Sequence, residues 1–192
     1  MKNFILGILF TLVVLVGGGA YFAMRGYIDT RADSEPSPLE SKFAMSAMDA
    51  SADRNAPETK NPVAPTDDNL VAGAKLYAAS CAGCHGYPAE VPAPAPLAFY
   101  PPAPQFFKDA PDMPDHENFY VIQHGVRWTG MPAWRAALTD QQIWQVVAFL
   151  SSIDKLPPAA RKELVPAFAA VPVAGGSSAP AAAPAPAEKP RK

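Results

Sequence analysis

The chain has 192 residues, 23 of them proline, and a formal net charge of −2. Hydrophobic residues make up 49% of it, and much of that share is alanine, so the composition predicts one modest core flanked by segments that do not fold. The only basic run is "EKPRK" at the C-terminal end. This argues against a nucleic-acid partner, because phosphate binding needs clustered Lys and Arg.

The N-terminal segment is the first element along the chain. Residues 4–24 carry no charge, and as a helix of about 21 residues they would span roughly 32 Å, close to the hydrocarbon thickness of a bilayer. A cleaved signal peptide is the alternative, with Lys2 as its positive start and Gly18 and Ala20 as small residues at a cleavage site. Because the apolar run continues past Ala20, we expect residues 1–25 to be an uncleaved transmembrane anchor.

Two segments have the composition of unfolded chain. Pro, Ser, Asp and Glu dominate residues 26–65, which predicts a disordered tether with a reach of roughly 35 Å. Within it, "KFAMSAM" could form a transient or partner-bound helical turn, but we favour a solvated linker. After Leu156 the chain is rich in Ala and Pro, so residues 157–192 are predicted to be a disordered tail.

Between them, residues 66–156 show the patterns of three helices and no strand of comparable quality. The first begins at "TDDNL", where Thr66 or Asp67 can cap. The second is "DHENFYVIQHG", with Asp115 as its cap and Gly125 as its stop. The third is "LTDQQIWQVVAFLSSI", which begins with a capping box of Thr139 and Gln142. We therefore predict an all-α module.

The stretch "CAGCHG" holds both cysteines of the chain. Cys81 and Cys84 at positions i and i+3, followed at once by His85, match the signature of covalent haem c attachment. Each thiol would form a thioether with one vinyl group of the porphyrin, and the imidazole would bind the iron. The alternatives are a zinc site completed by His116 and His124, a thioredoxin-like redox pair and a small disulfide loop, and each fits the surrounding sequence less well.

A second axial ligand is predicted in "GVRWTGMPAW". Met131 lies between Gly130 and Pro132, and this pairing lets the backbone pass close to a flat cofactor while restraining the loop that presents the thioether. We expect Met131 to bind the iron opposite His85. His124 is the main alternative ligand, and Met113 is a second loop methionine whose position the sequence leaves undetermined.

"CAGCHG", "GMPAW" and the helix "LTDQQIWQVVAFL" together resemble a class I c-type cytochrome, especially the single-haem modules related to the third subunit of cbb3-type oxidases. The resemblance covers about residues 69–153. It implies a small cytochrome c fold of three main helices around one covalent haem, with His85 proximal and Met131 distal. It also implies that the first helix packs against the last, where Gly73 and Tyr77 would meet the face that carries Trp144 and Phe149.

The segment "YPAEVPAPAPLAFYPPAPQFFKDAPDMP" departs from common family members in its proline content. In the family a proline carbonyl often holds the proximal imidazole, but which proline does so here is not readable from the sequence. We interpret the segment as a loop that covers the haem; a docking surface is the alternative. Its buried side chains would be Leu97, Phe99, Phe106 and Phe107. Trp128 and Trp134 are expected in haem-pocket packing, and Arg127 near a propionate or in solvent.

Two filled axial positions leave no open site for substrate, so the expected function is one-electron transfer and not catalysis. The resemblance implies a haem domain on the periplasmic side of a bacterial inner membrane, serving donor and acceptor proteins of a respiratory or photosynthetic complex. The module carries five basic against nine acidic side chains, a net charge of −4, which suggests a neutral or basic partner surface or stable membership of a complex. The alternatives are a haem enzyme or gas sensor with a labile distal ligand, and a structural subunit.

Overall fold

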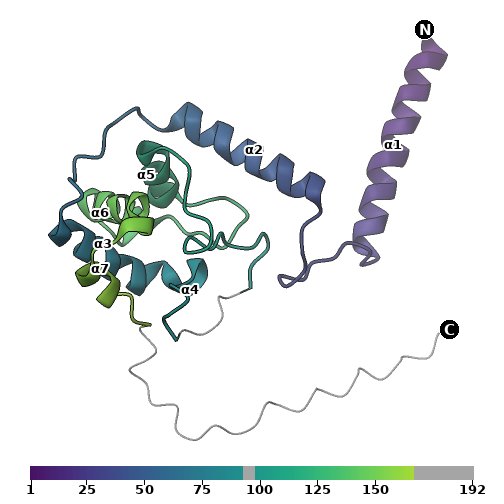
Figure 1. Cartoon of the computed structure of the whole chain (residues 1–192). Coiled ribbons are helices and arrows are strands. Elements are labelled where there is room, and N and C mark those ends of the chain that lie inside the picture. Colours follow the sequence, from purple (N-terminus) through teal and green to yellow (C-terminus); the bar gives the residue numbers. More distant parts are fainter. Residues whose placement is uncertain (93–97, 167–192) are drawn as a thin grey trace, which may run out of the picture.

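The computed structural model describes residues 1–92 and 98–166, and within them every regular element is helical, as predicted (Figure 1). In chain order the elements are α1 (Lys2–Met24), α2 (Pro38–Asn55), α3 (Asp67–Ser80), α4 (Ala82–His85), α5 (Asp115–His124), the 3-10 turn η1 (Trp134–Ala136), α6 (Asp140–Ser151), the 3-10 turn η2 (Ile153–Lys155) and α7 (Pro158–Lys162).

Helix α1 is the long apolar helix that the sequence predicted at residues 4–24. It has 23 residues and a mean hydropathy of 2.3, and none of its residues is buried by the rest of the chain. Its length and composition suffice to cross a bilayer, and Figure 1 shows it standing apart from the other helices. Among the described residues it is the one helix with this property.

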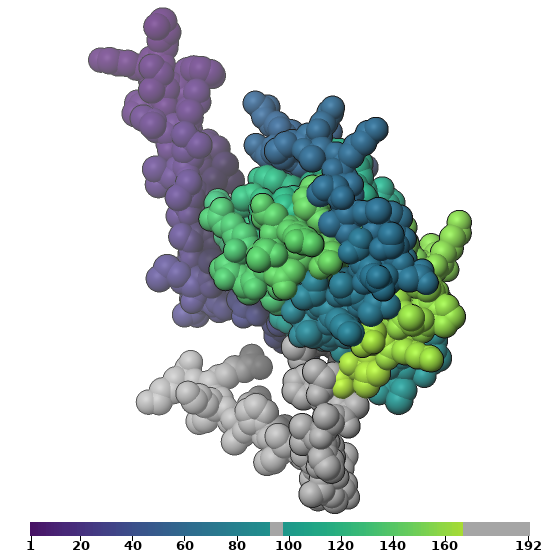
Figure 2. All heavy atoms as spheres, turned by 90° about the vertical axis from the view of Figure 1, so that its left-hand side faces the viewer, coloured from purple at the N-terminus to yellow at the C-terminus, as the bar shows by residue number. Residues whose placement is uncertain are grey.

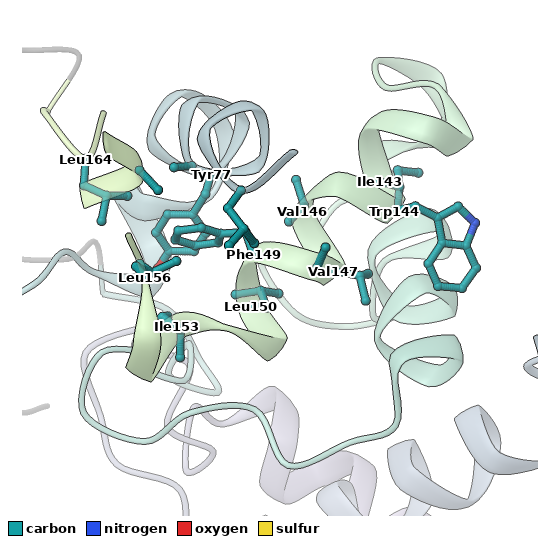
Figure 3. Packing of buried hydrophobic residues seen from close by; sticks show 14 of the residues in the cluster. Tyr77, Ile143, Trp144, Val146, Val147, Phe149, Leu150, Ile153, Leu156 and Leu164 are labelled. Carbon is teal, nitrogen blue, oxygen red and sulfur yellow. The ribbon is translucent and has the colours of Figure 1, made fainter. Parts of the chain in front are cut away.

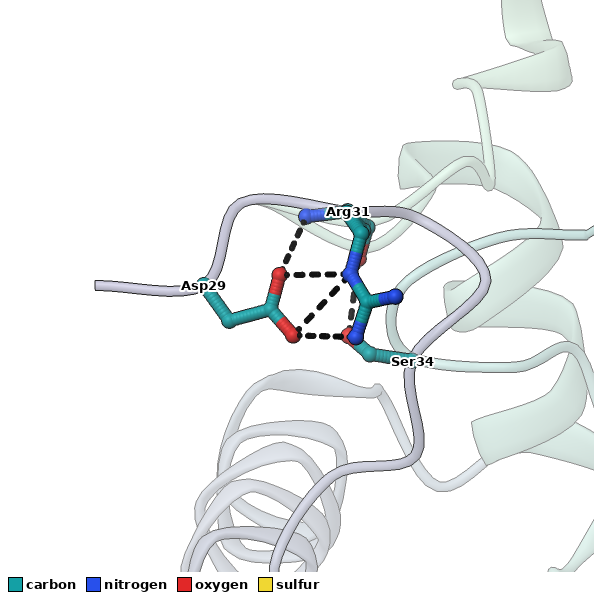
Figure 4. A network of polar contacts seen from close by, with 3 residues as sticks. All are labelled: Asp29, Arg31 and Ser34. Carbon is teal, nitrogen blue, oxygen red and sulfur yellow. Dashed lines mark hydrogen bonds and ion pairs between the residues drawn. The ribbon is translucent and has the colours of Figure 1, made fainter. Parts of the chain in front are cut away.

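A local polar turn follows the anchor (Figure 4). The Arg31 guanidinium donates to both carboxylate oxygens of Asp29, at 2.9 Å and 3.1 Å, and Ser34 Oγ donates to the Arg31 carbonyl at 2.8 Å. The hydrogen bonds from Arg31 lower the pKa of Asp29 to about 2. Because both side chains are exposed, this pair shapes the turn and adds little to stability.

Helix α2 corrects the prediction of a disordered tether for residues 38–55. The Ser37 side chain accepts from the Glu40 N–H at 3.2 Å, and Pro38 occupies the first helical turn, where its missing N–H costs nothing. The helix packs against α5, and Ala52 is buried there at 1% exposure. Most helical stability in proteins comes from tertiary packing, so docking on α5 stabilises α2. The composition of residues 38–55 does not reveal this contact.

We expect Ala52→Glu to release α2 from the module, because it places an unpaired charge in a buried contact. Amide hydrogen exchange across residues 38–55 should accelerate by about tenfold or more, which corresponds to roughly 1.4 kcal/mol of lost local stability. The matched control is Ala50→Glu on the exposed side of the same helix, which should leave the exchange rates unchanged. Equal exchange in both variants would mean that α2 does not dock.

The core is built where α3 crosses α6 (Figure 3). A Cβ atom on Gly73 would lie 2.8 Å from Phe149 Cβ, so only glycine admits this close crossing. The Tyr77 and Phe149 rings lie 5.0 Å apart between centroids. The predicted packing is therefore confirmed for Phe149. The predicted packing is wrong for Trp144, whose ring stacks on Phe119 of α5 with 4.1 Å between centroids. Trp144 lies five positions before Phe149 on the helix, so the two side chains are on different faces.

Two of the three predicted helix N-caps are confirmed. Thr66 accepts from the Asn69 N–H, and Thr139 forms the predicted capping box with Gln142. Asp115 does not cap α5; the cap is Pro114, and the Asp115 carboxylate accepts a hydrogen bond from the Ser151 hydroxyl of α6. The acid thus links two helices, a tertiary role that the local pattern does not reveal.

The module extends beyond the predicted boundary at Leu156. Helix α7 packs against α3, as Figure 2 shows, and Ala160 and Leu164 are buried at 0% and 1% exposure. An ion pair of 2.8 Å joins Arg161 to Glu90. This corrects the prediction of a disordered tail for residues 157–166; the remainder of that tail lies outside the described residues.

Candidate functional site

The end of α3 delivers the two cysteines and the histidine into one helical turn. Cys81 caps α4, and its carbonyl accepts from the N–H groups of Cys84 at 3.1 Å and His85 at 3.0 Å. Residues at i, i+3 and i+4 of a helix share a face, so both thiols and the imidazole belong to one side of the turn. Both cysteines are half-buried free thiols.

The environment of Cys81 disfavours the redox-pair alternative. Burial, together with the neighbouring Cys84, raises the pKa of the Cys81 thiol to about 12. Catalytic CxxC motifs instead have a lowered thiol pKa, because the thiolate is the nucleophile. In the described part of the chain no group of three His, Cys, Asp or Glu side chains could hold a metal ion, which disfavours the zinc alternative with His116 and His124.

His85 is buried and held in one tautomer. Its Nδ1 lies 2.9 Å from the Pro104 carbonyl, and because a carbonyl only accepts, Nδ1 carries the hydrogen and Nε2 keeps its lone pair for a metal. Burial lowers the pKa of His85, against a smaller opposing effect of the Pro104 bond, so the imidazole is neutral at physiological pH. Pro104 is thus the proline that the sequence did not identify.

Phe106 contacts this imidazole, and Phe107 packs against Tyr77 of the core. The Phe106 ring stacks on His85 with 4.4 Å between centroids and 6° between planes, and the Phe106 N–H donates to the His85 carbonyl at 3.2 Å. Phe107 packs edge-on against Tyr77 at 5.8 Å. Both phenylalanines are half-buried against the core. Leu97, expected in the same covering loop, lies outside the described residues.

Tyr77 forms a hydrogen bond to Gly86, the residue that follows His85. The sequence analysis did not predict this role. Its hydroxyl donates to the Gly86 carbonyl at 2.8 Å, and burial raises the pKa of the phenol well above its usual value. Gly86 has φ +82°, a conformation that favours glycine. The signal was present in the sequence as a tyrosine nine residues before a glycine, but only the fold brings them together.

Met131 lies in a loop that is closed by its own hydrogen bonds. The Val126 N–H donates to the Met131 carbonyl at 3.1 Å, and Thr129 Oγ1 donates to the Val126 carbonyl at 2.8 Å while accepting from the Met131 N–H at 3.0 Å. The methionine side chain is half-buried against the core. Gly130 has Phe99 beside it, with a ring atom 2.5 Å from where a Cβ would lie, so the backbone passes close to the proline-rich segment.

The two tryptophans of this loop region differ in environment. Trp134 is half-buried against the core, whereas Trp128 is 88% exposed and has φ +59°, unusual for a bulky residue. The Arg127 guanidinium lies 5.8 Å from the centroid of the Trp128 indole. The predicted haem-pocket packing of Trp128 therefore stays a prediction.

Other cavities lie away from these residues. A groove of about 730 Å³ runs between residues 58–65 and helices α5 and α6, and neither cysteine, His85 nor Met131 lines it. His116 lines this groove, and His124 is exposed with its ring 4.6 Å from Tyr120. Neither histidine shares the environment of His85.

The attachment turn fits a covalent haem. Two unpaired thiols stand one helical turn apart, and the adjacent imidazole has its Nε2 available. Met131 lies on a separate hydrogen-bonded loop and is half-buried against the core. The family model described as "Cytochrome C oxidase, cbb3-type, subunit III" matches residues 68–150. No curated protein and no solved structure gives a match.

Proposed function

We propose that the chain is a membrane-anchored one-electron carrier, in which residues 68–150, matched by the family model of cbb3-type subunit III, form a cytochrome c module that carries covalent haem c. In this proposal Cys81 and Cys84 form the two thioethers, His85 is the proximal ligand and Met131 the distal ligand. When bound, the haem supplies the Fe(III)/Fe(II) couple.

The observation that carries the proposal is that both candidate axial residues are fixed by the chain itself. The His85 imidazole is oriented by the Pro104 carbonyl at 2.9 Å, and the Met131 backbone N–H donates to the Thr129 hydroxyl at 3.0 Å, which fixes the loop that carries the thioether. Ligands that are held before and after the electron moves need little rearrangement, which suits electron transfer. A soft thioether also favours the reduced state, and neutral imidazole is a common metal ligand.

Location follows from the anchor and from where haem c is attached. Haem attachment in this family takes place outside the cytoplasm, so we place the module on the periplasmic face of a bacterial inner membrane, with α1 as a single span. Because α2 docks on the module, the free connection is residues 25–37, with a reach of roughly 20 Å. The module would then stay close to its membrane partners, with a higher effective concentration there than on a 40-residue tether.

Partners are the donor and acceptor proteins of a respiratory or photosynthetic complex. The net charge of −4 on residues 66–156 suits neutral or basic surfaces better than an acidic one. A haem enzyme or gas sensor would need a distal ligand that leaves readily, and the three hydrogen bonds of the Met131 loop favour the carrier over that alternative.

The test is to produce the full chain with an intact haem c maturation pathway and to purify it from detergent-solubilised membranes. We expect one haem per chain that survives denaturation and a redox titration that fits a single one-electron couple. Cys81→Ser combined with Cys84→Ser should abolish the covalent link. Wild-type protein without porphyrin mass or visible absorption would overturn the proposal.

A further inference from the structure

We propose that Gln105 is a positioning residue for the His85 imidazole: its side-chain amide ties the turn that carries Cys81, Cys84 and His85 to the proline-rich segment and so holds the Pro104 carbonyl on Nδ1. This inference rests on the proposed role of His85 as the proximal ligand. It adds a residue that no motif assigns to the site.

The amide of Gln105 bridges two parts of the chain that are distant in sequence. Its Nε2 donates to the Cys84 carbonyl at 2.9 Å and to the Ala103 carbonyl at 2.9 Å. Both amide hydrogens are therefore used, one on each segment. One end of the bridge is Cys84, the residue before His85, and the other is Ala103, the residue before Pro104. The bridge therefore fixes the separation between His85 and Pro104.

Residues 104–106 thereby all form hydrogen bonds with the turn that carries Cys84 and His85. Pro104 accepts from the imidazole, Gln105 donates to the Cys84 carbonyl, and Phe106 donates its N–H to the His85 carbonyl while its ring stacks on the imidazole. Pro101, Pro102 and Pro104 have no N–H to donate, so the backbone there has few means of fastening itself. A side-chain amide supplies the missing donors.

The packing around the amide is tight enough to fix its position. A Cβ atom on Gly86 would lie 2.6 Å from Gln105 Oε1, so the amide lies directly against the glycine backbone. The Gly86 carbonyl also accepts a hydrogen bond from the Tyr77 hydroxyl at 2.8 Å. Gln105 is itself half-buried, which limits competition from water.

The consequence for the metal follows from the hydrogen bond at Nδ1. A carbonyl that accepts from Nδ1–H makes the imidazole more basic at Nε2, and a more basic ligand favours Fe(III). Loss of the bridge would let the Pro104 carbonyl move, weaken this bond and favour Fe(II). Gln105 would thus act on the reduction potential through His85 without touching the haem.

The experiment compares Gln105→Ala and Gln105→Glu in the full-length holoprotein. Glutamate keeps the volume of the side chain but cannot donate to the two carbonyls. Two quantities are measured: the exchange rate of the His85 Nδ1 proton by NMR of the ferrous protein, and the midpoint potential. We expect the exchange to accelerate about tenfold in both variants. The potential of Gln105→Ala should rise by up to the 59 mV of a tenfold one-electron shift, whereas the added negative charge of Gln105→Glu acts on its potential in the opposite direction.

Gln123→Ala is the matched control, because its amide makes a single exposed bond to Asp140 at 3.1 Å on another face. Its exchange rate and potential should equal those of the wild type. If the wild type binds haem with His85 as ligand but the exchange rate is unchanged in both variants and the potential is unchanged in Gln105→Ala, the positioning role is excluded. If the wild type shows no His85 ligation, the proposed function fails instead, and the two results are distinguishable.

Discussion

Replacing Met131 with alanine is expected to convert a protein that does not bind carbon monoxide into one that binds it readily when reduced. The substitution removes the proposed distal thioether but leaves the loop, because its three hydrogen bonds use the Val126 and Met131 backbones and the Thr129 hydroxyl. The potential should fall by more than 59 mV, a tenfold one-electron shift, since a soft ligand for the reduced state is lost. Carbon monoxide difference spectra and redox titration check both effects.

Met113→Ala is the control for this prediction. Met113 is also a half-buried loop methionine, and its carbonyl, which accepts from Asn118 Nδ2 at 2.8 Å, is unaffected by the substitution. Its variant should keep the wild-type spectrum and potential. Carbon monoxide binding by Met113→Ala and not by Met131→Ala would assign the distal position to the other methionine. Binding by the wild type would favour the gas-sensor alternative.

Gly73→Ala is expected to have the largest effect on stability among conservative changes in the core. The added methyl group would lie 2.8 Å from Phe149 Cβ and 3.0 Å from the Gln145 carbonyl carbon, so two helix backbones must separate. Overpacking of this kind costs about 1–3 kcal/mol. Intrinsic helix propensity favours alanine over glycine by about 0.8–1.0 kcal/mol, so the net loss is the steric cost less this gain, and any net loss must come from the steric conflict.

Denaturant unfolding of the full-length holoprotein measures this loss. Ala79→Gly on the exposed face of the same helix is the control, because it changes propensity without touching the crossing and should cost only about 1 kcal/mol. A larger residue at the crossing, as in Gly73→Val, should prevent folding or haem retention. Stability equal to or above the wild type in Gly73→Ala would show that α3 and α6 do not meet as closely as described.

The attachment motif and the helices could be predicted from local patterns. The spacing of Cys81, Cys84 and His85 is a property of the chain that needs no fold to be visible, and the same holds for the apolar run of α1 and the capping box of Thr139. Each signal is made by residues within a few positions of one another. Local physical chemistry, such as helix capping and membrane-length hydrophobicity, therefore suffices to interpret them.

What only the tertiary structure decided are the contacts between distant segments. Pro104 among many prolines, Gln105 as a bridge to Cys84, and α2 as a docked helix all depend on groups that meet only after folding. The reason is that a carbonyl or amide has no distinguishing signature in sequence; its role is set by which partner the fold brings within hydrogen-bond distance. The sequence by itself thus determined the cofactor chemistry and the helical class, and the packing of the chain decided how the imidazole is held.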